Sequence, residues 1–264
     1  MKNFKLISFC LAFLIVPFVV CAQNDKTGRV IDELTVIKKN GKYGFADRTG
    51  RIVIAPEYDA VPDKSLDGML MLMKNDKVGV IDKKGKVIIP FIYYDMGERL
   101  YAGGNLFAIM SEGNKWGFAD RTGRVLFAPQ FEDFDDFGND LIRIKKNGKY
   151  GLVDKTGKIV APAIYDEMGT FPDGVTPVKK NGRCGYINSI GRIAVPLEYD
   201  FAGAIQEGMA VVVKNGKWGY VDSTGRLVIP CRYDSATNFY DGEATVYIGR
   251  EHYRIDKKGN RLSR

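Results

Sequence analysis

The sequence predicts an all-β protein built as a tandem repeat array, and three observations support this fold class. One ten-residue phrase recurs along the chain, as in the stretches that begin at Lys42, Lys115 and Lys217. Apolar residues follow a period of two, and residues 23–264 show no convincing amphipathic helix. The glycine near the end of the phrase recurs at steps of 35, 38, 34, 34, 34 and 34 residues, at Gly50, Gly85, Gly123, Gly157, Gly191, Gly225 and Gly259.

Each unit begins with a predicted β-hairpin. In the sixth unit, residues 209–213 read Met-Ala-Val-Val-Val and predict a strand, and residues 218–221 predict the strand that returns. Asn215 and Gly216 lie between them. These residue types accept the positive φ angles that a tight hairpin turn needs.

A second turn and a third strand complete the unit. Asp222 can accept a hydrogen bond from a backbone N–H two residues later, and Gly225 suits the left-handed position of the turn. Residues 227–229 predict a third strand, which we expect Pro230 to stop because proline donates no ladder hydrogen bond. The sequence therefore predicts about seven three-stranded meander units of about 34 residues.

Two departures from the repeat have simple interpretations. The longest step comes from extra residues within Met96–Asn105, which predicts a surface loop there. In the last unit, His252 and Tyr253 replace the aromatic residue and the glycine of the phrase. Terminal repeats are atypical because they cap the stack.

The chain resembles the WG repeat family, also called KWG, over residues 35–259. The resemblance lies in the Lys-Trp-Gly phrases at 115–117 and 217–219 and in the trailing Pro-x-x-Tyr-Asp, as at 162–166. It implies a β-rich repeat array, often secreted by bacteria, without an established catalytic centre. The departures from the pattern are Val78, Cys184, Asn188 and the stretch 129–132.

The repeats can pack in two ways. A lone three-stranded meander is marginally stable, so each unit must bury a face against its neighbour. We expect an open solenoid or superhelix. The alternative is a closed propeller-like ring, but propeller blades usually take about 40–45 residues.

The amino terminus predicts export. Lys2 and Lys5 precede an apolar run over residues 6–20, and Ala22 suits a cut before Gln23. This layout is typical of a secretory signal peptide over residues 1–22, followed by a lead-in over 23–34 and the repeat array over 35–264. A helix of fifteen residues reaches only about 22 Å, too short for a membrane span.

We therefore expect a periplasmic or extracellular protein with no membrane span once the signal is removed. Lipid attachment through Cys21 is the alternative, although Val20 is large for the position before a lipidated cysteine. Cys184 and Cys231 lie at unrelated places in the repeat, and we interpret them as two isolated buried thiols.

Composition argues against several kinds of chemistry. The net charge of +7 falls to +5 once residues 1–22, with two lysines and no acids, are removed. This mild charge gives no reason to expect a nucleic-acid partner. The chain holds one histidine, and no cluster with metal-ligand spacing, nucleophile motif or phosphate-binding glycine loop. We expect no metal, no cofactor and no catalytic residue.

Aromatic residues recur at the position before the glycine of the phrase. They could form a platform for sugar rings or a peptide, but the same residues suit packing between units. The residues at this position are Tyr43, Trp116, Tyr150 and Trp218. A second aromatic series allows the same two interpretations and comprises Tyr58, Tyr94, Tyr165, Tyr199 and Tyr233.

Lysines flank nearly every hairpin turn. Stacked in register, they would form a cationic ridge able to bind an anionic polymer, and the candidates are Lys146, Lys149, Lys214 and Lys217. The alternative is protection of the hairpins against strand-to-strand aggregation.

Carboxylates are the remaining candidates for a catalytic or metal-binding role. Those of the second turn have a structural interpretation, because Asn188 replaces one of them and keeps its turn chemistry. The acidic stretch 131–140 predicts a solvated loop rather than a calcium site, since it lacks the calcium-loop pattern.

Together these observations predict an exported, non-enzymatic repeat protein, monomeric, that presents an extended surface to a protein or to a cell-envelope polysaccharide. The alternatives are a carbohydrate-active hydrolase with two inter-repeat carboxylates and a structural spacer.

Overall fold

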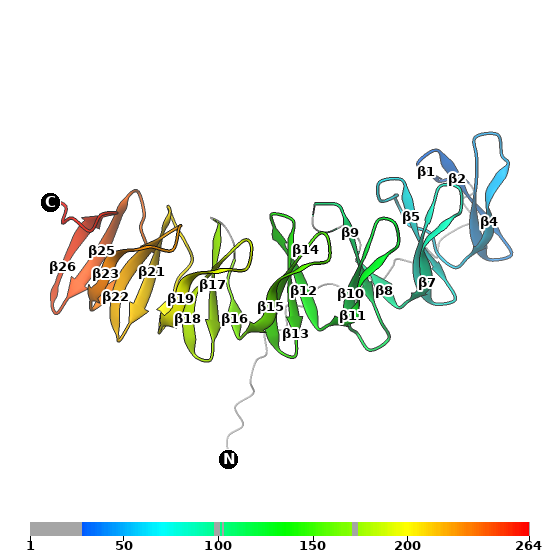
Figure 1. Ribbon diagram of the computed structural model, residues 1–264. Coiled ribbons are helices and arrows are strands. Elements are labelled where there is room, and N and C mark those ends of the chain that lie inside the picture. The colour runs from blue at the N-terminus through cyan, green and yellow to red at the C-terminus, as the bar shows by residue number, and fades with distance from the viewer. Residues whose placement is uncertain (1–27, 98–100, 102, 171–173, 264) are drawn as a thin grey trace, which may run out of the picture. The chain divides into compact units, whose positions relative to one another are not determined.

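The computed structural model describes residues 28–97, 101, 103–170 and 174–263. The predicted signal peptide, its cleavage site and Cys21 lie outside the described residues. The described residues form two compact units, which lie within residues 1–92 and 93–264, and each is described by itself (Figure 1).

The first unit contains two antiparallel sheets in which strands pair in chain order. Residues 30–34 of the predicted lead-in belong to the first sheet, because β1 pairs with β2. The strands are β1 (Val30–Ile31), β2 (Leu34–Lys39), β3 (Lys42–Ala46) and β4 (Ile52–Tyr58), then β5 (Met69–Lys74), β6 (Lys77–Asp82) and β7 (Val87–Tyr93).

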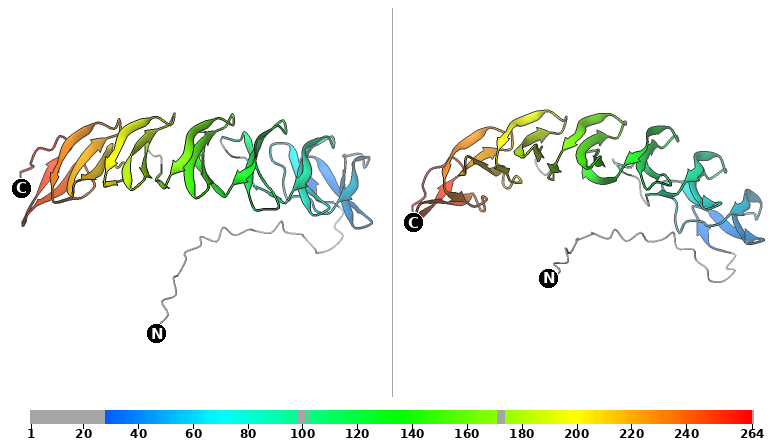
Figure 2. Two further views of the ribbon diagram at one scale, coloured as in Figure 1. Left: turned by 60° about the horizontal axis from the view of Figure 1, so that its bottom comes forward. Right: turned by 90° about the horizontal axis from the view of Figure 1, so that it is seen from below.

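The second unit contains five further sheets of the same kind, which follow one another in a row (Figures 1 and 2). Their strands are β8 (Asp95–Met96), β9 (Leu106–Met110), β10 (Trp116–Asp120) and β11 (Val125–Phe131); β12 (Asp133–Gly138), β13 (Leu141–Lys146), β14 (Lys149–Asp154) and β15 (Ile159–Tyr165); β16 (Glu167–Met168), β17 (Val175–Lys180), β18 (Arg183–Asn188) and β19 (Ile193–Tyr199); β20 (Phe201–Ala202), β21 (Met209–Lys214), β22 (Lys217–Asp222) and β23 (Leu227–Tyr233); and β24 (Ser235–Ala236), β25 (Glu243–Ile248) and β26 (Glu251–Asp256).

The all-β repeat array is confirmed, and it is an open one. Within the second unit, the first and last sheets lie at opposite ends of the row (Figure 2) and share no strand pair among the described residues. The predicted three strands per unit need a correction, since five of the seven sheets have four. The extra strand is short, as where Phe201 and Ala202 pair with Val213 and Val212.

The third predicted strand does not stop at the proline. β23 runs through Pro230 to Tyr233, and Pro230 lies in a bulge of this edge strand. Trp218 pairs with Tyr233 and Tyr220 pairs with Ile229, so three residues of β23 lie opposite Gly219 alone. A proline is tolerated there because the bulge needs no ladder hydrogen bond.

The bulge explains why the phrase contains a glycine. A Cβ on Gly219 would lie 2.5 Å from the carbonyl oxygen of Ile229 and 2.7 Å from the backbone nitrogen of Cys231. No side chain fits under backbone at that distance. The same close approach recurs in six sheets, at Gly44, Gly79, Gly117, Gly151, Gly185 and Gly219.

The core lies between neighbouring sheets rather than within one. The cluster around Tyr220, Ile229 and Tyr233 of one sheet includes Val246 and Ile255 of the next. Four other clusters join neighbouring repeats in the same way. Within each unit, neighbouring sheets therefore bury their faces on one another, as expected for a repeat array.

Buried tyrosines also tie one repeat to the next by hydrogen bonds. The Tyr186 hydroxyl donates to the carbonyl of Gly203 at 2.6 Å, and the Tyr220 hydroxyl donates to the carbonyl of Thr237 at 2.7 Å. Burial raises the pKa of both phenols. They therefore remain protonated donors at neutral pH.

The turn glycines pack against the preceding repeat. Gly225 has a φ of 89°, and a Cβ there would lie 2.9 Å from the carbonyl oxygen of Ala194 in the previous sheet. Both the left-handed backbone and the close approach require glycine. The turns at Gly191 and Gly225 thus cover the second and third residues of the preceding edge strand and leave the first residue uncovered.

The acidic stretch is largely a strand, not the loop we predicted. β12 pairs with β13 over residues 133–138, because Phe134 packs edge-on against Trp116 and Phe118 of the preceding sheet, at 5.0 and 5.3 Å between ring centroids. These ring contacts hold the stretch against the array, while Asp133 and Asp136 are exposed.

Both described cysteines are free. Cys184 is buried as expected, whereas Cys231 is only half-buried. Burial raises the pKa of both thiols, which keeps them protonated and poorly nucleophilic.

Gly219→Ala tests the close approach under the bulge. We expect this variant to lose about 1–3 kcal/mol of unfolding free energy, because the methyl group must displace backbone. Gly113→Ala is the matched control, since a Cβ at Gly113 has no atom within 4 Å. Urea denaturation of both full-chain variants measures the difference, and equal midpoints would contradict the role of the bulge.

Thr176→Val tests a buried polar atom. The Thr176 side chain is fully buried and its hydroxyl has no hydrogen-bond partner, so we expect Val to be neutral or stabilising by about 1 kcal/mol. Thr156→Val is the comparison, because the Thr156 hydroxyl donates to Asp154 at 2.6 Å. Thermal unfolding should give a higher midpoint temperature for Thr176→Val than for Thr156→Val.

Candidate functional site

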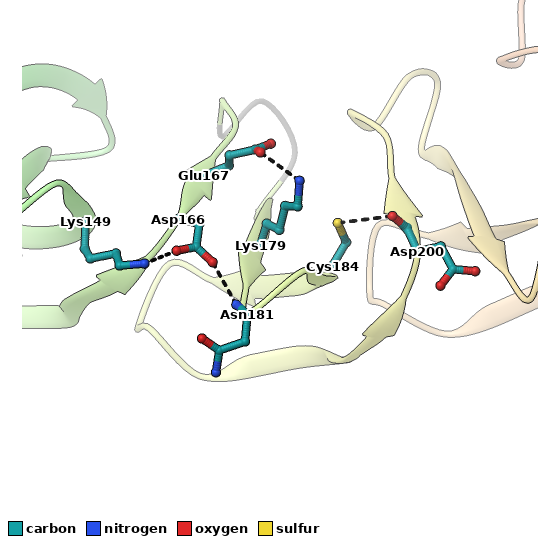
Figure 3. A network of polar contacts seen from close by, with 7 residues as sticks. All are labelled: Lys149, Asp166, Glu167, Lys179, Asn181, Cys184 and Asp200. Carbon is teal, nitrogen blue, oxygen red and sulfur yellow. Dashed lines mark hydrogen bonds and ion pairs between the residues drawn. The ribbon is translucent and has the colours of Figure 1, made fainter.

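The candidate ridge lysines lie at the hairpin ends of the sheets. Lys149 forms an ion pair with Asp166, and the second oxygen of Asp166 accepts a hydrogen bond from the backbone N–H of Asn181 at 2.7 Å (Figure 3). Asp166 therefore connects the hairpin of its own repeat to the hairpin of the next. We call this arrangement the carboxylate clasp.

The clasp recurs along both units. Asp59 binds Lys42 and the N–H of Asn75, and Asp234 binds Lys217 and the N–H of Gly249. Glu132 accepts from the N–H of Gly148 at 3.0 Å. In each of these three Asp clasps, the lysine that opens the repeated phrase pairs with the aspartate of the Tyr-Asp that follows it. This ion pair explains why both residues occur in the same repeat.

Most of the candidate ridge lysines therefore have acidic partners. Besides Lys149 and Lys217, Lys214 pairs with Glu198 at 2.9 Å, and Lys146 donates to the side-chain oxygen of Gln130 at 2.6 Å. A nearby pair, Lys179 with Glu167 at 2.8 Å, is visible in Figure 3. The hairpin end is thus a surface of mixed charge, which suits protection of strand edges better than capture of a polyanion.

The clasp carboxylates are held ionised. The hydrogen bond from the lysine side chain lowers the pKa of Asp59 and of Asp166 below the ordinary value, and the Gly249 N–H does the same for the pKa of Asp234. For Glu132 the main cause of the lowered pKa is the N–H of Gly148. A carboxylate with a lowered pKa is a poor general acid at neutral pH.

The candidate aromatic residues lie half-buried at the margins of the inter-repeat clusters. Trp116 packs against Phe134, and Trp218 lies near Phe201 at 6.4 Å between ring centroids. Tyr43 packs against the core cluster of the first unit, which contains Phe45 and Leu70. The Lys38 ammonium group lies 4.9 Å from the centre of the Tyr43 ring. Their positions favour the packing interpretation over an open platform.

Tyr150 has the most unusual surroundings of the four. The Lys145 ammonium group and the Arg143 guanidinium group lie 5.2 and 5.5 Å from its ring. Arg143 also binds Asp135 through two nitrogens, at 3.0 and 2.7 Å, and donates to the carbonyl of Met168 at 2.8 Å. Arg143 therefore joins two neighbouring repeats, and Tyr150 is part of that joint.

In the second aromatic series, Tyr94 is a wrong assignment. Tyr93 is the buried residue that ends β7, whereas Tyr94 is 42% exposed. Tyr94 occupies the place of the aspartate in Tyr-Asp. The other four members, Tyr58, Tyr165, Tyr199 and Tyr233, are buried.

The turn carboxylates have the structural role that the sequence indicates. One oxygen of Asp222 accepts from the N–H of Thr224 at 2.9 Å, from its hydroxyl at 2.6 Å and from the N–H of Arg226 at 3.0 Å. The side-chain oxygen of Asn188 accepts the equivalent bonds from Ile190 and Arg192. These hydrogen bonds lower the pKa of Asp222 despite its partial burial.

Within the described ranges, no group of three or more His, Cys, Asp or Glu side chains could hold a metal ion. The same ranges contain no helix long and apolar enough to cross a bilayer.

A different surface stands out in the structure, and the sequence interpretation missed it. In six repeats, the edge strand that follows the second turn begins with an exposed aliphatic side chain, and the next two residues are half or fully buried in most of these strands, which are β4, β7, β11, β15, β19 and β23. We call these residues the rim. They are Ile52 (52% exposed), Val87 (49%), Val125 (43%), Ile159 (57%), Ile193 (57%) and Leu227 (44%).

An exposed basic residue immediately precedes every rim residue. Arg124 and Arg226 lie 3.1 and 3.8 Å from the turn carboxylates Asp120 and Asp222, and their side chains remain 71% and 78% exposed. The full set is Arg51, Lys86, Arg124, Lys158, Arg192 and Arg226. Each repeat thus presents one cation and one aliphatic group at the same place.

The sequence signal for the rim is the triplet of Gly, basic residue and aliphatic residue, as at 225–227. Three apolar residues in a row, such as 227–229, are typical of a strand buried on both faces, so the run itself does not indicate an exposed position. Only the packing of the next repeat's turn decides which of the three is exposed.

The geometry defines a tandem β-sheet repeat protein with a periodic surface, and comparison with known proteins gives its family. The model of the WG containing repeat matches at residues 43–77, 79–116, 116–150, 150–184, 185–218 and 218–249. The chain therefore belongs to the WG repeat family. No curated protein sequence gives a significant match.

Several solved structures are similar at low scores. The crystal structure of the eukaryotic initiation factor is 11% identical, with a TM-score of 0.35 over 86% of this chain and 72% of that one. BamB from Moraxella catarrhalis is 13% identical, with a TM-score of 0.29 over 88% and 83%. Hsv2p from Kluyveromyces lactis is 10% identical, with a TM-score of 0.32 over 72% and 71%. At such scores these similarities carry no functional conclusion.

The clasp predicts acid sensitivity. A pKa lowered in the folded state contributes stability above the ordinary value of 3.8, and this contribution is lost as pH falls through the lower folded value. We expect the unfolding free energy to decline below about pH 4, and to decline less steeply in Asp166→Asn/Asp234→Asn, whose amides do not titrate. Urea denaturation at a series of pH values measures both slopes.

Asp133→Asn is the control for this experiment, because Asp133 is exposed and lies outside the clasps. Equal slopes for the clasp variant and the unmodified chain would mean that the clasps do not contribute to acid stability.

Proposed function

We propose that this chain is an exported, non-enzymatic repeat protein that presents an extended surface to a macromolecular partner, and that the rim is the core of that surface. The observation that carries the proposal is the recurrence of an exposed aliphatic residue at one position in six successive repeats. A single exposed aliphatic residue is ordinary, whereas a periodic row indicates an interaction site.

A protein partner fits the rim better than a glycan. Burying an aliphatic side chain against sugar hydroxyl groups leaves those groups without hydrogen-bond partners, which costs free energy. The aromatic residues that could stack on sugar rings are half-buried between repeats. A protein partner offers apolar side chains of its own, so both surfaces leave water together.

The electrostatics of the carboxylates support a non-enzymatic function. A glycoside hydrolase needs one carboxyl group whose pKa is raised, so that it can act as general acid. Among the described residues, each carboxyl group with a displaced pKa has it lowered, as at Asp154, Asp166 and Glu207.

Substitution of rim residues tests the proposal. Burial of a half-exposed aliphatic side chain contributes about 1 kcal/mol, so Ile159→Ser/Ile193→Ser should weaken partner binding about tenfold or more. The assay is capture of envelope components on the immobilised full chain, followed by identification of the retained species by mass spectrometry and glycan staining.

The matched control is Ile164→Ser/Ile248→Ser, which removes two exposed isoleucines outside the rim. The proposal requires that this control retain the partner that the rim variant loses. Equal capture by both variants, or hydrolysis of a glycan by the unmodified chain, would contradict it.

A further inference from the structure

The rim of the second unit carries information about the chemistry of its partner. Four rim positions follow one another in this unit, at Val125, Ile159, Ile193 and Leu227. The basic residue before each one is also exposed, at Arg124, Lys158, Arg192 and Arg226. We propose that this surface binds an extended, acidic polypeptide segment in which carboxylate and aliphatic side chains recur about every third residue. This inference rests on the proposed function, which it deepens by naming the partner class.

The charge of the rim selects an acidic partner. Lys149, Lys214 and Lys217 of the hairpin ends pair with acidic side chains, whereas the rim of the second unit carries an exposed cation in four successive repeats. Arg124 and Arg226 pair with Asp120 and Asp222 of their own turns, and these carboxylates also accept three other hydrogen bonds each. A partner carboxylate therefore meets exposed guanidinium nitrogens that can bind it in bidentate fashion.

The repeat spacing selects an extended chain. Packed sheets lie about 10 Å apart, and an extended polypeptide advances about 3.3 Å per residue. One rim position therefore corresponds to about three partner residues, and the four positions span a segment of about ten to twelve residues.

The rim binds through side chains rather than by adding a strand. A proline interrupts the backbone donors of each of the four rim strands, at Pro129, Pro162, Pro196 and Pro230. Prolines and bulges block strand-to-strand pairing. Only about three residues of each edge remain for backbone pairing, too few for a stable added strand.

Two other occupants fit less well. A second copy of this chain would bring one basic rim against another, and like charges repel. A membrane surface favours aromatic anchors and protruding apolar groups, whereas the rim residues are aliphatic and only about half exposed.

A synthetic peptide tests the inference directly. The probe is a fluorescein-labelled peptide of five Asp-Val-Ser triplets, and fluorescence anisotropy with the full chain measures its affinity. We expect binding that weakens about tenfold or more as sodium chloride rises from about 50 to 300 mM, because the exposed charges are screened. A peptide with the same composition but blocks of Asp, Val and Ser should bind more weakly, since its spacing does not match the repeats.

Variants separate the charge from the aliphatic groups. Arg192→Gln/Arg226→Gln and Ile159→Ser/Ile193→Ser should each weaken peptide binding about fivefold or more. The matched charge control is Lys180→Gln/Arg250→Gln, which removes two cations at hairpin positions and should leave affinity unchanged. Far-ultraviolet circular dichroism and thermal unfolding verify that each variant is folded.

The outcomes are distinct. Equal affinity for the ordered and block peptides, no binding at low salt, or binding of phosphatidylglycerol vesicles in place of the peptide would overturn the inference. If the peptide fails while the rim variant still loses its captured partner, the inference fails and the proposed function stands. If rim substitutions also leave capture unchanged, both fail.

Discussion

The array depends on the close approach between a glycine in one strand and the bulged backbone of the edge strand beside it. At Gly219 a side chain would collide with the backbone of Ile229 and Cys231, and the same approach recurs in six sheets. The bulge lets Tyr233 pair with Trp218 while Pro230 sits where no donor is needed. Without glycine the edge strand would lose this register, and the buried tyrosine of each repeat would leave the inter-repeat core.

Most charged groups of the repeat are used to hold the array together. Turn carboxylates such as Asp222 satisfy backbone N–H groups within one turn, and clasp carboxylates such as Asp166 join consecutive hairpins. Exposed ion pairs contribute little individually, but carboxylate bonds to the backbone N–H groups of the next hairpin recur at Asp59, Glu132, Asp166 and Asp234. The charge that remains at the rim therefore has a different role from the charge at the hairpins.

The rim is a consequence of how the repeats stack. A turn glycine covers the second and third residues of the preceding edge strand where Gly191 contacts Val160 and Ala161 and where Gly225 contacts Ala194 and Val195. The first residue, Ile193, stays exposed. Because the units repeat, one uncovered residue becomes a row with regular spacing, and a partner that contacts several positions at once gains affinity by multivalency. Weak contacts at each single repeat are therefore sufficient for such a surface to bind a partner tightly.

The sequence by itself determined the all-β class, the repeat length, the hairpins and the Asp-x-x-Gly turns, because these depend on local residue types and on a period that is visible without a structure. It also indicated that Asn188 and Asp222 serve turns. Only the tertiary structure decided the fourth short strand, the passage of β23 through Pro230 and the strand at residues 133–138, since each depends on pairing or packing with residues elsewhere. The candidate lysines looked free in the sequence because their acidic partners lie about half a repeat away, as Asp166 does from Lys149. The rim needed the structure for the same reason: the turn of the next repeat, not the strand's own pattern, decides that Ile193 is exposed.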